Sequence, residues 1–301
     1  MSLFNLFRRK PKLPKPPKPQ MMPGWNAPNA DVHLADSKAL ALAKGLPMGV
    51  IRWGGTASQT QVSMGDIHAL TTIAKVLNTP VVITADLYDS TVAQALDRIT
   101  AHIDAGVNVV GVELGNESYL PRYRGCITSP EVYIDKAKAL RDAVKAIYPA
   151  MPCGVVIAPT AAMRDPDSAT TLPAYLGRWN SAMLAQRWPD AVVLHSYVDP
   201  RKTGPSYADH AKSVKAALLA LSPRRVWLTE VGVIGECPAE VRANHRRDML
   251  DVAAKAGNVD LFCWHSLAGR GPHVAIRVEA GPHGTAIGYS DFGNIVAKET
   301  T

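Results

Sequence analysis

The sequence predicts an α/β protein: a single (β/α)8 TIM barrel behind a disordered, basic, proline-rich N-terminal leader. Three observations lead to this prediction. Short apolar runs rich in β-branched residues alternate with helical patterns from about residue 36 onward. These runs are apolar throughout, which is typical of parallel strands covered on both faces. The chain has 301 residues, 47% of them apolar, and can therefore bury one large core.

Residues 1–23 form the predicted leader. Six prolines in residues 11–23 remove backbone donors and hold the chain extended, so neither helix nor sheet is expected there. Residues 1–20 hold six of the 33 basic residues and no acid, which leaves 27 basic and 26 acidic residues in the remainder. Two interpretations of the leader stay open: a disordered end, or a peptide that docks on an acidic surface or a larger assembly such as a virus particle.

Residues 24–301 form the predicted barrel domain, in which each helical pattern leads to a strand. The expected helices cover residues 37–44, 66–77, 91–105, 130–147, 173–187, 207–221 and 239–256. The strands that follow them cover residues 48–53, 80–85, 107–114, 154–158, 191–195, 226–229 and 259–264. The available candidate for the first strand is short, residues 31–34. Strand number alone also permits a doubly wound open sheet, but the repeat spacing favours the barrel.

The end of the chain departs from this repeat. Residues 273–278 and 285–289 are expected to form a hairpin around Gly281 and Pro282, followed by a short closing helix. We interpret this segment as a decorated last loop of the barrel.

Composition excludes several classes of protein. The nearly neutral body offers no basic stripe with interleaved aromatics, so nucleic acid is not an expected partner. The N-terminus lacks the apolar run of a secretory signal, and no stretch has the length of a transmembrane helix. We therefore expect a location in the cytoplasm or on an assembly such as a virion. The four cysteines lie far apart and are expected to be free thiols, although one disulfide stays possible.

Two glutamates stand at the ends of expected strands. Glu117 follows Gly115-Asn116, and Glu230 follows Thr229 at the end of a second apolar run. Because parallel strands end on the same side of a barrel, both carboxylates should lie at its mouth. A retaining glycosidase needs two carboxyl groups about 5–5.5 Å apart, one to protonate the leaving oxygen and one to attack the anomeric carbon. The pattern predicts that chemistry, with no cofactor and no metal.

Longer motifs around these positions resemble a known group. Glu113-Leu114-Gly115-Asn116-Glu117 and Arg52-Trp53-Gly54-Gly55-Thr56 are similar to the strand-four and strand-two signatures of clan A glycoside hydrolases. The motifs are most similar to those of three groups: the heparanase and β-glucuronidase families, the α-arabinofuranosidases and the β-xylosidases. The resemblance implies an enzyme that cleaves oligo- or polysaccharides with retention.

The resemblance also implies roles for individual residues. It makes Glu117 the acid/base and Glu230 the nucleophile. It implies that Asn116 holds a sugar hydroxyl and that Arg52 orients the nucleophile and keeps it ionised. The expected supporting residues also include Trp53, His195, Tyr197, which would hydrogen-bond the nucleophile, and Trp264, which would floor the sugar site.

Other interpretations of these residues remain. Glu113 is expected to be a buried partner of a basic residue. His195 and His265 could be packed core histidines or could contact the substrate, and Trp53 and Trp264 could be ordinary core aromatics. A metal-dependent hydrolase would need further clustered His and Asp ligands. A non-catalytic carbohydrate-binding or structural barrel, tethered by its leader, is the alternative function. The presence of both Glu117 and Glu230 argues against it, because loss of one carboxylate is the simplest route to a protein that only binds.

Overall fold

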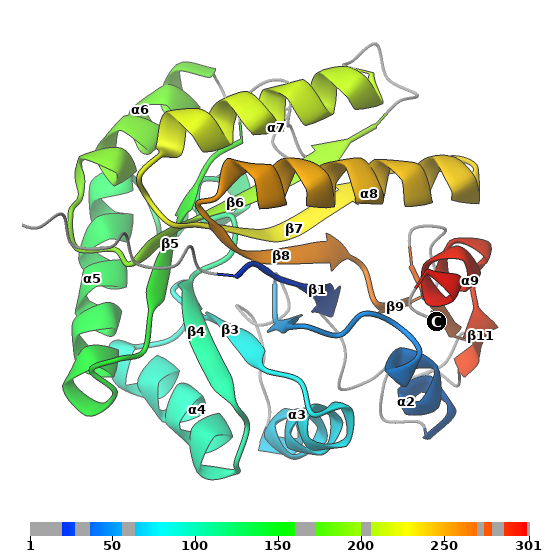
Figure 1. Cartoon of the computed structure of the whole chain (residues 1–301). Helices are drawn as coiled ribbons and strands as arrows, with labels where there is room; N and C mark the ends of the chain where they lie inside the picture. The colour runs from blue at the N-terminus through cyan, green and yellow to red at the C-terminus, as the bar shows by residue number, and fades with distance from the viewer. Residues whose placement is uncertain are drawn as a thin grey trace, which may run out of the picture.

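The structure is a computed structural model and describes residues 20–27, 37–55, 64–159, 173–199, 206–269, 274–278 and 286–299. Eight parallel strands close into a barrel in chain order (Figure 1). They are β1 (Met22–Ala27), β2 (Ile51–Trp53), β3 (Val81–Ala85), β4 (Val109–Leu114), β5 (Cys153–Ile157), β6 (Ala191–Val198), β7 (Val226–Val233) and β8 (Val259–His265). Because β1 pairs in parallel with both β2 and β8, the barrel is closed and the predicted fold class is confirmed.

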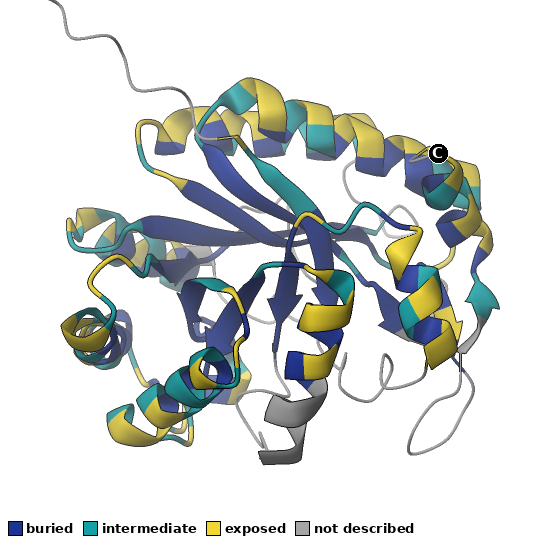
Figure 2. Ribbon diagram, turned by 60° about the horizontal axis from the view of Figure 1, so that its bottom comes forward, coloured by how far each residue is buried: buried dark blue, intermediate teal, exposed yellow. Residues whose placement is uncertain are grey.

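Helices surround the barrel and bury one face each against it (Figure 2). They are α2 (Ser37–Lys44), α3 (Met64–Leu77), α4 (Val92–Asp104), α5 (Pro130–Ile147), α6 (Pro173–Ala185), α7 (Tyr207–Leu221), α8 (Ala239–Ala256) and α9 (Asp291–Lys298), with a short 3-10 turn, η2, at Pro121–Tyr123. The predicted bounds of α2, α5, α7 and α8 are confirmed.

Side-chain caps explain where several helices begin. Thr91 and Gln94 form a capping box at α4, as do Ser206 and Asp209 at α7. Each pair satisfies backbone N–H groups that a helix start leaves without partners. Gly257 ends α8 in the left-handed conformation, with φ of 71°.

The segment after β8 completes the ring of helices. It forms a small sheet of β9 (Ala268–Gly269), β10 (Ile276–Val278) and β11 (Ala286–Tyr289), in which β10 and β11 are antiparallel. This confirms the predicted hairpin, and α9 is the predicted closing helix. Contacts of α9 with α8 and of β11 with α2 place this segment between helices α8 and α2 (Figure 1).

The first strand is the main correction to the sequence analysis. It is Met22–Ala27, not residues 31–34, which lie outside the described residues, and its first two residues fall within the predicted leader. Trp25 N donates to Val50 O at 3.0 Å. A side chain at Gly24 would lie 1.8 Å from that same oxygen, so glycine is required for the close approach to the segment before β2. The division into leader and barrel stays a prediction.

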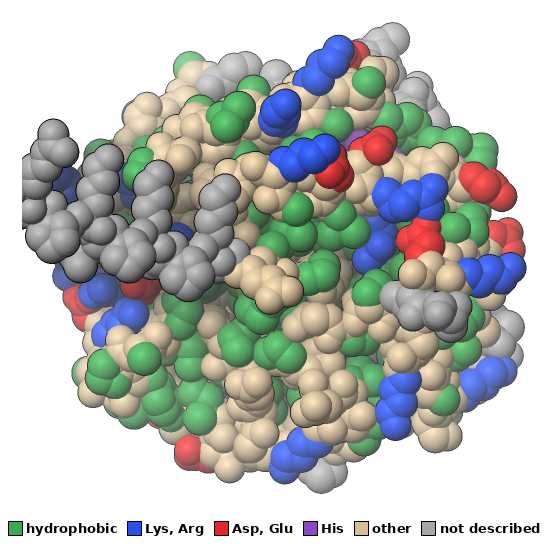
Figure 3. All heavy atoms as spheres, in the orientation of Figure 1, with side chains coloured by type: hydrophobic (Ala, Val, Ile, Leu, Met, Phe, Trp, Pro, Cys, Tyr) green, Lys and Arg blue, Asp and Glu red, His purple; other side chains and the backbone are tan. Residues whose placement is uncertain are grey.

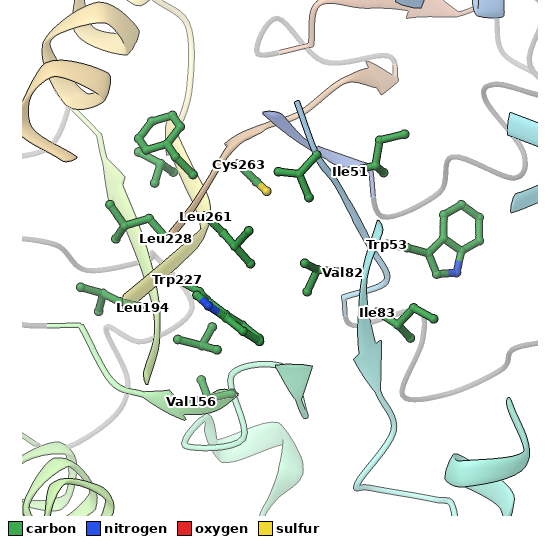
Figure 4. Packing of buried hydrophobic residues seen from close by; sticks show 14 of the residues in the cluster. Ile51, Trp53, Val82, Ile83, Val156, Leu194, Trp227, Leu228, Leu261 and Cys263 are labelled. Carbon is green, nitrogen blue, oxygen red and sulfur yellow. The ribbon is translucent and has the colours of Figure 1, made fainter. Parts of the chain in front are cut away.

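An indole fills part of the barrel interior. Trp227 of β7 projects across it (Figure 4). A Cβ added to Gly111 of β4 would lie 2.7 Å from this ring, and one added to Gly154 of β5 would lie 2.8 Å from it. The two glycines therefore provide the space that the Trp227 ring occupies.

The surface shows no concentration of one charge on the face in Figure 3, where basic and acidic side chains are interspersed. Among the described helices, none combines the length and apolar character that a bilayer crossing requires.

The four cysteines are free thiols, as expected. They are Cys126, Cys153, Cys237 and Cys263.

Candidate active site

Charged and polar side chains from several strands converge inside the mouth of the barrel. Arg52 of β2 lies at their centre and has no solvent exposure. Its Nε donates to Glu113 Oε2 at 2.8 Å and its Nη2 to Glu113 Oε1 at 2.5 Å, a bidentate pair. Its Nη1 donates to Glu230 Oε1. One guanidinium thus joins the carboxylates of β4 and β7.

This arrangement determines the charge of the three groups. Burial raises the pKa of Glu113, but Arg52 and His195 together outweigh it and hold that pKa below its usual value. Burial also raises the pKa of Glu230, while His195 and Arg52 lower it further than burial raises it. Burial lowers the pKa of Arg52, and the two carboxylates more than reverse this effect. All three groups are therefore ionised at neutral pH.

Backbone geometry places Glu117 in the mouth. The loop after β4 turns at Gly115, with φ of 86°, and Glu117 itself has φ of 44°. A Cβ at Gly115 would lie 2.6 Å from Ser118 Oγ, so the turn requires glycine. The Glu117 carboxylate accepts from Tyr119 OH at 3.4 Å and from Arg122 Nη2 at 3.3 Å.

His195 of β6 lies among the carboxylates. Its Nδ1 is 3.3 Å from Glu117 Oε1 and 3.8 Å from Glu230 Oε2, and its Nε2 is 3.4 Å from Glu113 Oε1. Burial lowers its pKa, but the charge of Glu230 and contacts with Glu113 and Glu117 raise it to about 10. The ring is therefore an imidazolium at neutral pH and offsets part of the negative charge.

Glu117 and Glu230 approach each other closely. One side-chain ligand atom from each of Glu117, His195 and Glu230 lies within 4.8 Å of the other two. Oxygen atoms of the two glutamates are thus no more than 4.8 Å apart, close enough for carboxylates that act on one bond.

The same three residues have the spacing of metal ligands. Two charges disfavour that use. Arg52 already donates to Glu230, and His195 carries a proton that it would have to lose to bind a cation. The arrangement suits a carboxylate pair better than a metal centre.

Most of the predicted site residues meet at this mouth. The structure brings together Arg52, Asn116, Glu117, His195, Tyr197 and Glu230. Tyr197 OH donates to Glu230 Oε2 at 2.5 Å, which is the hydrogen bond that the sequence analysis expected. Asn116 Oδ1 accepts from Arg52 Nη2 at 2.8 Å, and Glu113 is the expected buried partner of a basic residue.

The two predicted tryptophans lie elsewhere. Trp53 lines a small cavity with Ala95 and Ile99 of α4, and Figure 4 shows it pointing away from the barrel interior. Trp264 has no exposure and packs on His245 of α8 and Phe292 of α9, each with ring centroids 6.2 Å away. The sequence analysis therefore placed both indoles on the wrong face, because successive residues of a strand point to opposite sides.

Two further residues of the site were not assigned to it by the sequence analysis. Asn26 of β1 accepts from Arg52 Nη1 at 3.2 Å, and its Nδ2 lies 2.8 Å from Nδ1 of His265 in β8. Asn26 belongs to a strand that the sequence did not reveal. For His265 the sequence analysis left two interpretations open, a packed histidine and a substrate contact, and its position next to Trp264 on the opposite face of β8 was a usable signal.

Comparisons with known proteins address the fold. No family model matches the chain, and no curated protein matches its sequence. Solved structures do match. A family 51 α-L-arabinofuranosidase from Bifidobacterium longum has a TM-score of 0.69 at 14% identity, over 94% of this chain and 73% of that one.

Two further structures match over nearly their whole length. An endo-1,4-β-D-mannanase from Thermotoga petrophila has a TM-score of 0.56 at 13% identity, over 93% of this chain and 99% of that one. An endo-β-1,3-glucanase from Amycolatopsis mediterranei has a TM-score of 0.56 at 17% identity, with the same coverage of 93% and 99%. The chain has the barrel fold of clan A glycosidases.

Proposed function

We propose that this protein is a retaining O-glycosidase that acts on an oligo- or polysaccharide, with Glu230 as nucleophile and Glu117 as acid/base. The observation that carries the proposal is the pair of carboxylates at the mouth of the barrel, with one oxygen atom of Glu117 no more than 4.8 Å from one of Glu230. Inverting enzymes hold their carboxyl groups about 6.5–9.5 Å apart to admit a water molecule, so the close approach of these two oxygen atoms favours retention.

The surroundings of Glu230 suit a nucleophile. Arg52 Nη1 and Tyr197 OH each donate to one of its oxygens, which keeps the carboxylate ionised and oriented. In the first step a Glu230 oxygen forms a bond to the anomeric carbon while the bond to the leaving oxygen breaks. Glu117 gives its proton to that oxygen. The product is a covalent glycosyl ester.

The second step returns both residues to their starting state. Glu117, now a carboxylate, takes a proton from water, and the resulting hydroxide oxygen displaces Glu230 from the anomeric carbon. Glu117 has to hold a proton before the first step. The Arg122 side chain, whose Nη2 lies 3.3 Å from Glu117 Oε2, is 38% exposed, so this ion pair is weak and can open.

Aryl glycosides of gluco, glucurono, xylo, arabino and galacto configuration provide the test. We expect cleavage of at least one, with the first product released in the configuration of the substrate as seen by proton NMR. Glu230→Gln should abolish turnover, while the exposed Glu240→Gln should not. External azide should restore turnover of Glu117→Ala on substrates with a good leaving group, because the second step then no longer needs a base.

Several outcomes would contradict the proposal. Full activity of both Glu117→Ala and Glu230→Gln would exclude the assigned residues, and an inverted first product would exclude the mechanism. Sugar binding by the parent protein without turnover would instead support a non-catalytic barrel.

A further inference from the structure

Strand β8 presents a histidine, not a tryptophan, to the mouth of the barrel. His265 is the partly exposed residue of β8, whereas Trp264 is completely buried against the outer helices. The His265 ring meets the ring of Tyr197 edge-on, with centroids 5.6 Å apart and an interplanar angle of 81°. Tyr197 in turn donates to Glu230. His265 therefore lies beside the nucleophile and within reach of a ligand.

Hydrogen bonds determine which nitrogen of His265 carries the proton. Arg52 can only donate, so the Asn26 atom that meets Arg52 Nη1 at 3.2 Å is the acceptor Oδ1. The other end of this amide, Nδ2, is then the donor that faces His265 Nδ1 at 2.8 Å. Nδ1 accepts that bond and is unprotonated, which leaves the proton of a neutral ring on Nε2.

Burial is the main reason that this ring stays neutral. Burial lowers the pKa of His265, and the positive charges of Arg52 and His195 lower it as well. Glu230 and Glu117 act in the opposite direction but do not reverse the net shift. The hydrogen bonds from Arg52 to Asn26 and from Asn26 to His265 thus place the single ring proton of His265 on Nε2.

We propose that His265 contacts the sugar bound between the carboxylates and donates its Nε2–H to a sugar hydroxyl, with Asn26 as the positioning residue that sets its tautomer. The inference rests on the proposed glycosidase function. An indole offers a broad apolar platform, whereas this imidazole is smaller and adds a directed donor. The substrate class is therefore a glycoside that has a hydroxyl group facing β8, and glycosides without that hydroxyl are discriminated against.

Kinetics on the best aryl glycoside of the panel test the contact. His265→Phe keeps a ring but removes the donor, and we expect kcat/KM to fall about 10- to 100-fold. His265→Gln retains an amide donor and should recover part of this loss. Trp264→Phe is the matched control, and should lower the melting temperature while changing kcat/KM by less than about 2-fold, because Trp264 packs outside the mouth.

Monodeoxy versions of the same substrate identify the hydroxyl. Removal of one hydroxyl should cost the parent enzyme about 10-fold but should cost His265→Phe little, because the bond is already lost. Equal losses in parent and variant at every position would overturn the contact, as would a larger kinetic loss in Trp264→Phe than in His265→Phe.

A spectroscopic measurement tests the tautomer without turnover. In long-range proton–nitrogen correlation spectra of the full chain at pH 7, with signals assigned through His265→Phe, His265 should be neutral with its proton on Nε2. Asn26→Leu should remove this preference. A proton on Nδ1, or an imidazolium, would overturn the inference about His265 and leave the proposed glycosidase function unaffected. A parent protein that cleaves no glycoside would contradict the proposed function and with it the sugar contact.

Discussion

Strand β6 contributes to two buried polar networks of different electrostatic character. His195 and Tyr197 point into the mouth of the barrel, where they meet the ionised groups around Arg52. Ser196, between them, points outward and its Oγ lies 2.8 Å from Nε2 of His210 in α7. His210 Nδ1 lies 2.9 Å from Nε2 of His245 in α8, which completes the outer network.

The difference between the networks lies in their partners rather than in their burial. The inner His195 is surrounded by carboxylates, which raise its pKa to about 10. In the outer network burial lowers the pKa of His210 to about 3 and that of His245 to about 4. A buried histidine is thus charged where carboxylates surround it and neutral where only hydroxyl and imidazole groups do.

The largest effect should come from removing the inner cation. Arg52→Gln leaves Glu113 and Glu230 buried without their guanidinium, and we expect the free energy of unfolding to fall by about 3–5 kcal/mol. Urea denaturation at pH 7 measures this. Arg52→Lys keeps the positive charge but loses the bidentate guanidinium geometry, so its free energy of unfolding should lie between those of Arg52→Gln and the parent. An Arg52→Gln protein as stable as the parent would show that Arg52 is not needed to stabilise the buried carboxylates of Glu113 and Glu230.

The two networks should contribute differently to the change in stability as the pH falls. The folded pKa values of His210 and His245 lie below the ordinary value of 6.5, so between pH 6.5 and 4 the unfolded chain binds protons that the folded chain does not. Stability therefore falls with pH there, by at most about 1.4 kcal/mol per pH unit for each histidine. His265, whose pKa is also lowered, adds to this slope.

The inner network contributes differently over this range. His195 stays protonated, and the stability that Glu113 and Glu230 provide is lost only below their ordinary value of 4.5. A protein with His210→Gln and His245→Gln should therefore lose less stability between pH 6.5 and 5 than the parent in urea titrations. An unchanged slope would mean that the outer histidines are not responsible.

Neighbouring substitutions on β6 should act on different properties. Tyr197→Phe removes a donor from Glu230, and we expect kcat/KM to fall by about 10-fold or more. Ser196→Ala removes the hydroxyl from the outer network, and should lower the free energy of unfolding by about 1 kcal/mol without changing kcat/KM. If Ser196→Ala impairs turnover as much as Tyr197→Phe, the two networks are coupled through the strand.

A deletion outside both networks should have the smallest effect on the fold. Removal of residues 1–19 stops short of β1, which begins at Met22, so melting temperature and turnover should be unchanged. We expect weaker binding to anionic vesicles, with a difference that disappears as salt rises. Replacing the six leader cations by glutamine is the matched control. A loss of stability on deletion would mean that the leader packs on the barrel.

The parts of the fold that were predictable have local signals. Helix α8 was predicted to the residue from its helical pattern. Strands β6 and β7 are longer than predicted. The predictions stopped early because polar site residues, such as Tyr197 and Glu230, interrupt the apolar runs that indicated the strands. Strand β1 contains proline and glycine and no β-branched residue, so pairing with β2 and β8, rather than local preference, makes it a strand.

The site was predictable where short motifs identify residues. Such motifs located Arg52, Glu117 and Glu230. They could not show which face a side chain takes in a strand that is apolar on both sides, because such a strand lacks the alternation that distinguishes its faces. Trp264 was therefore chosen where His265 faces the mouth.

The indole of Trp227 has a consequence for how this sequence can diverge. It occupies the volume that side chains at Gly111 and Gly154 would need. Enlarging either glycine first places a methyl group against the ring, so position 227 has to shrink before either of them can grow. The intermediate with a smaller residue there carries a cavity and its cost in stability. These three positions, from three strands, can therefore be exchanged only along an ordered mutational path.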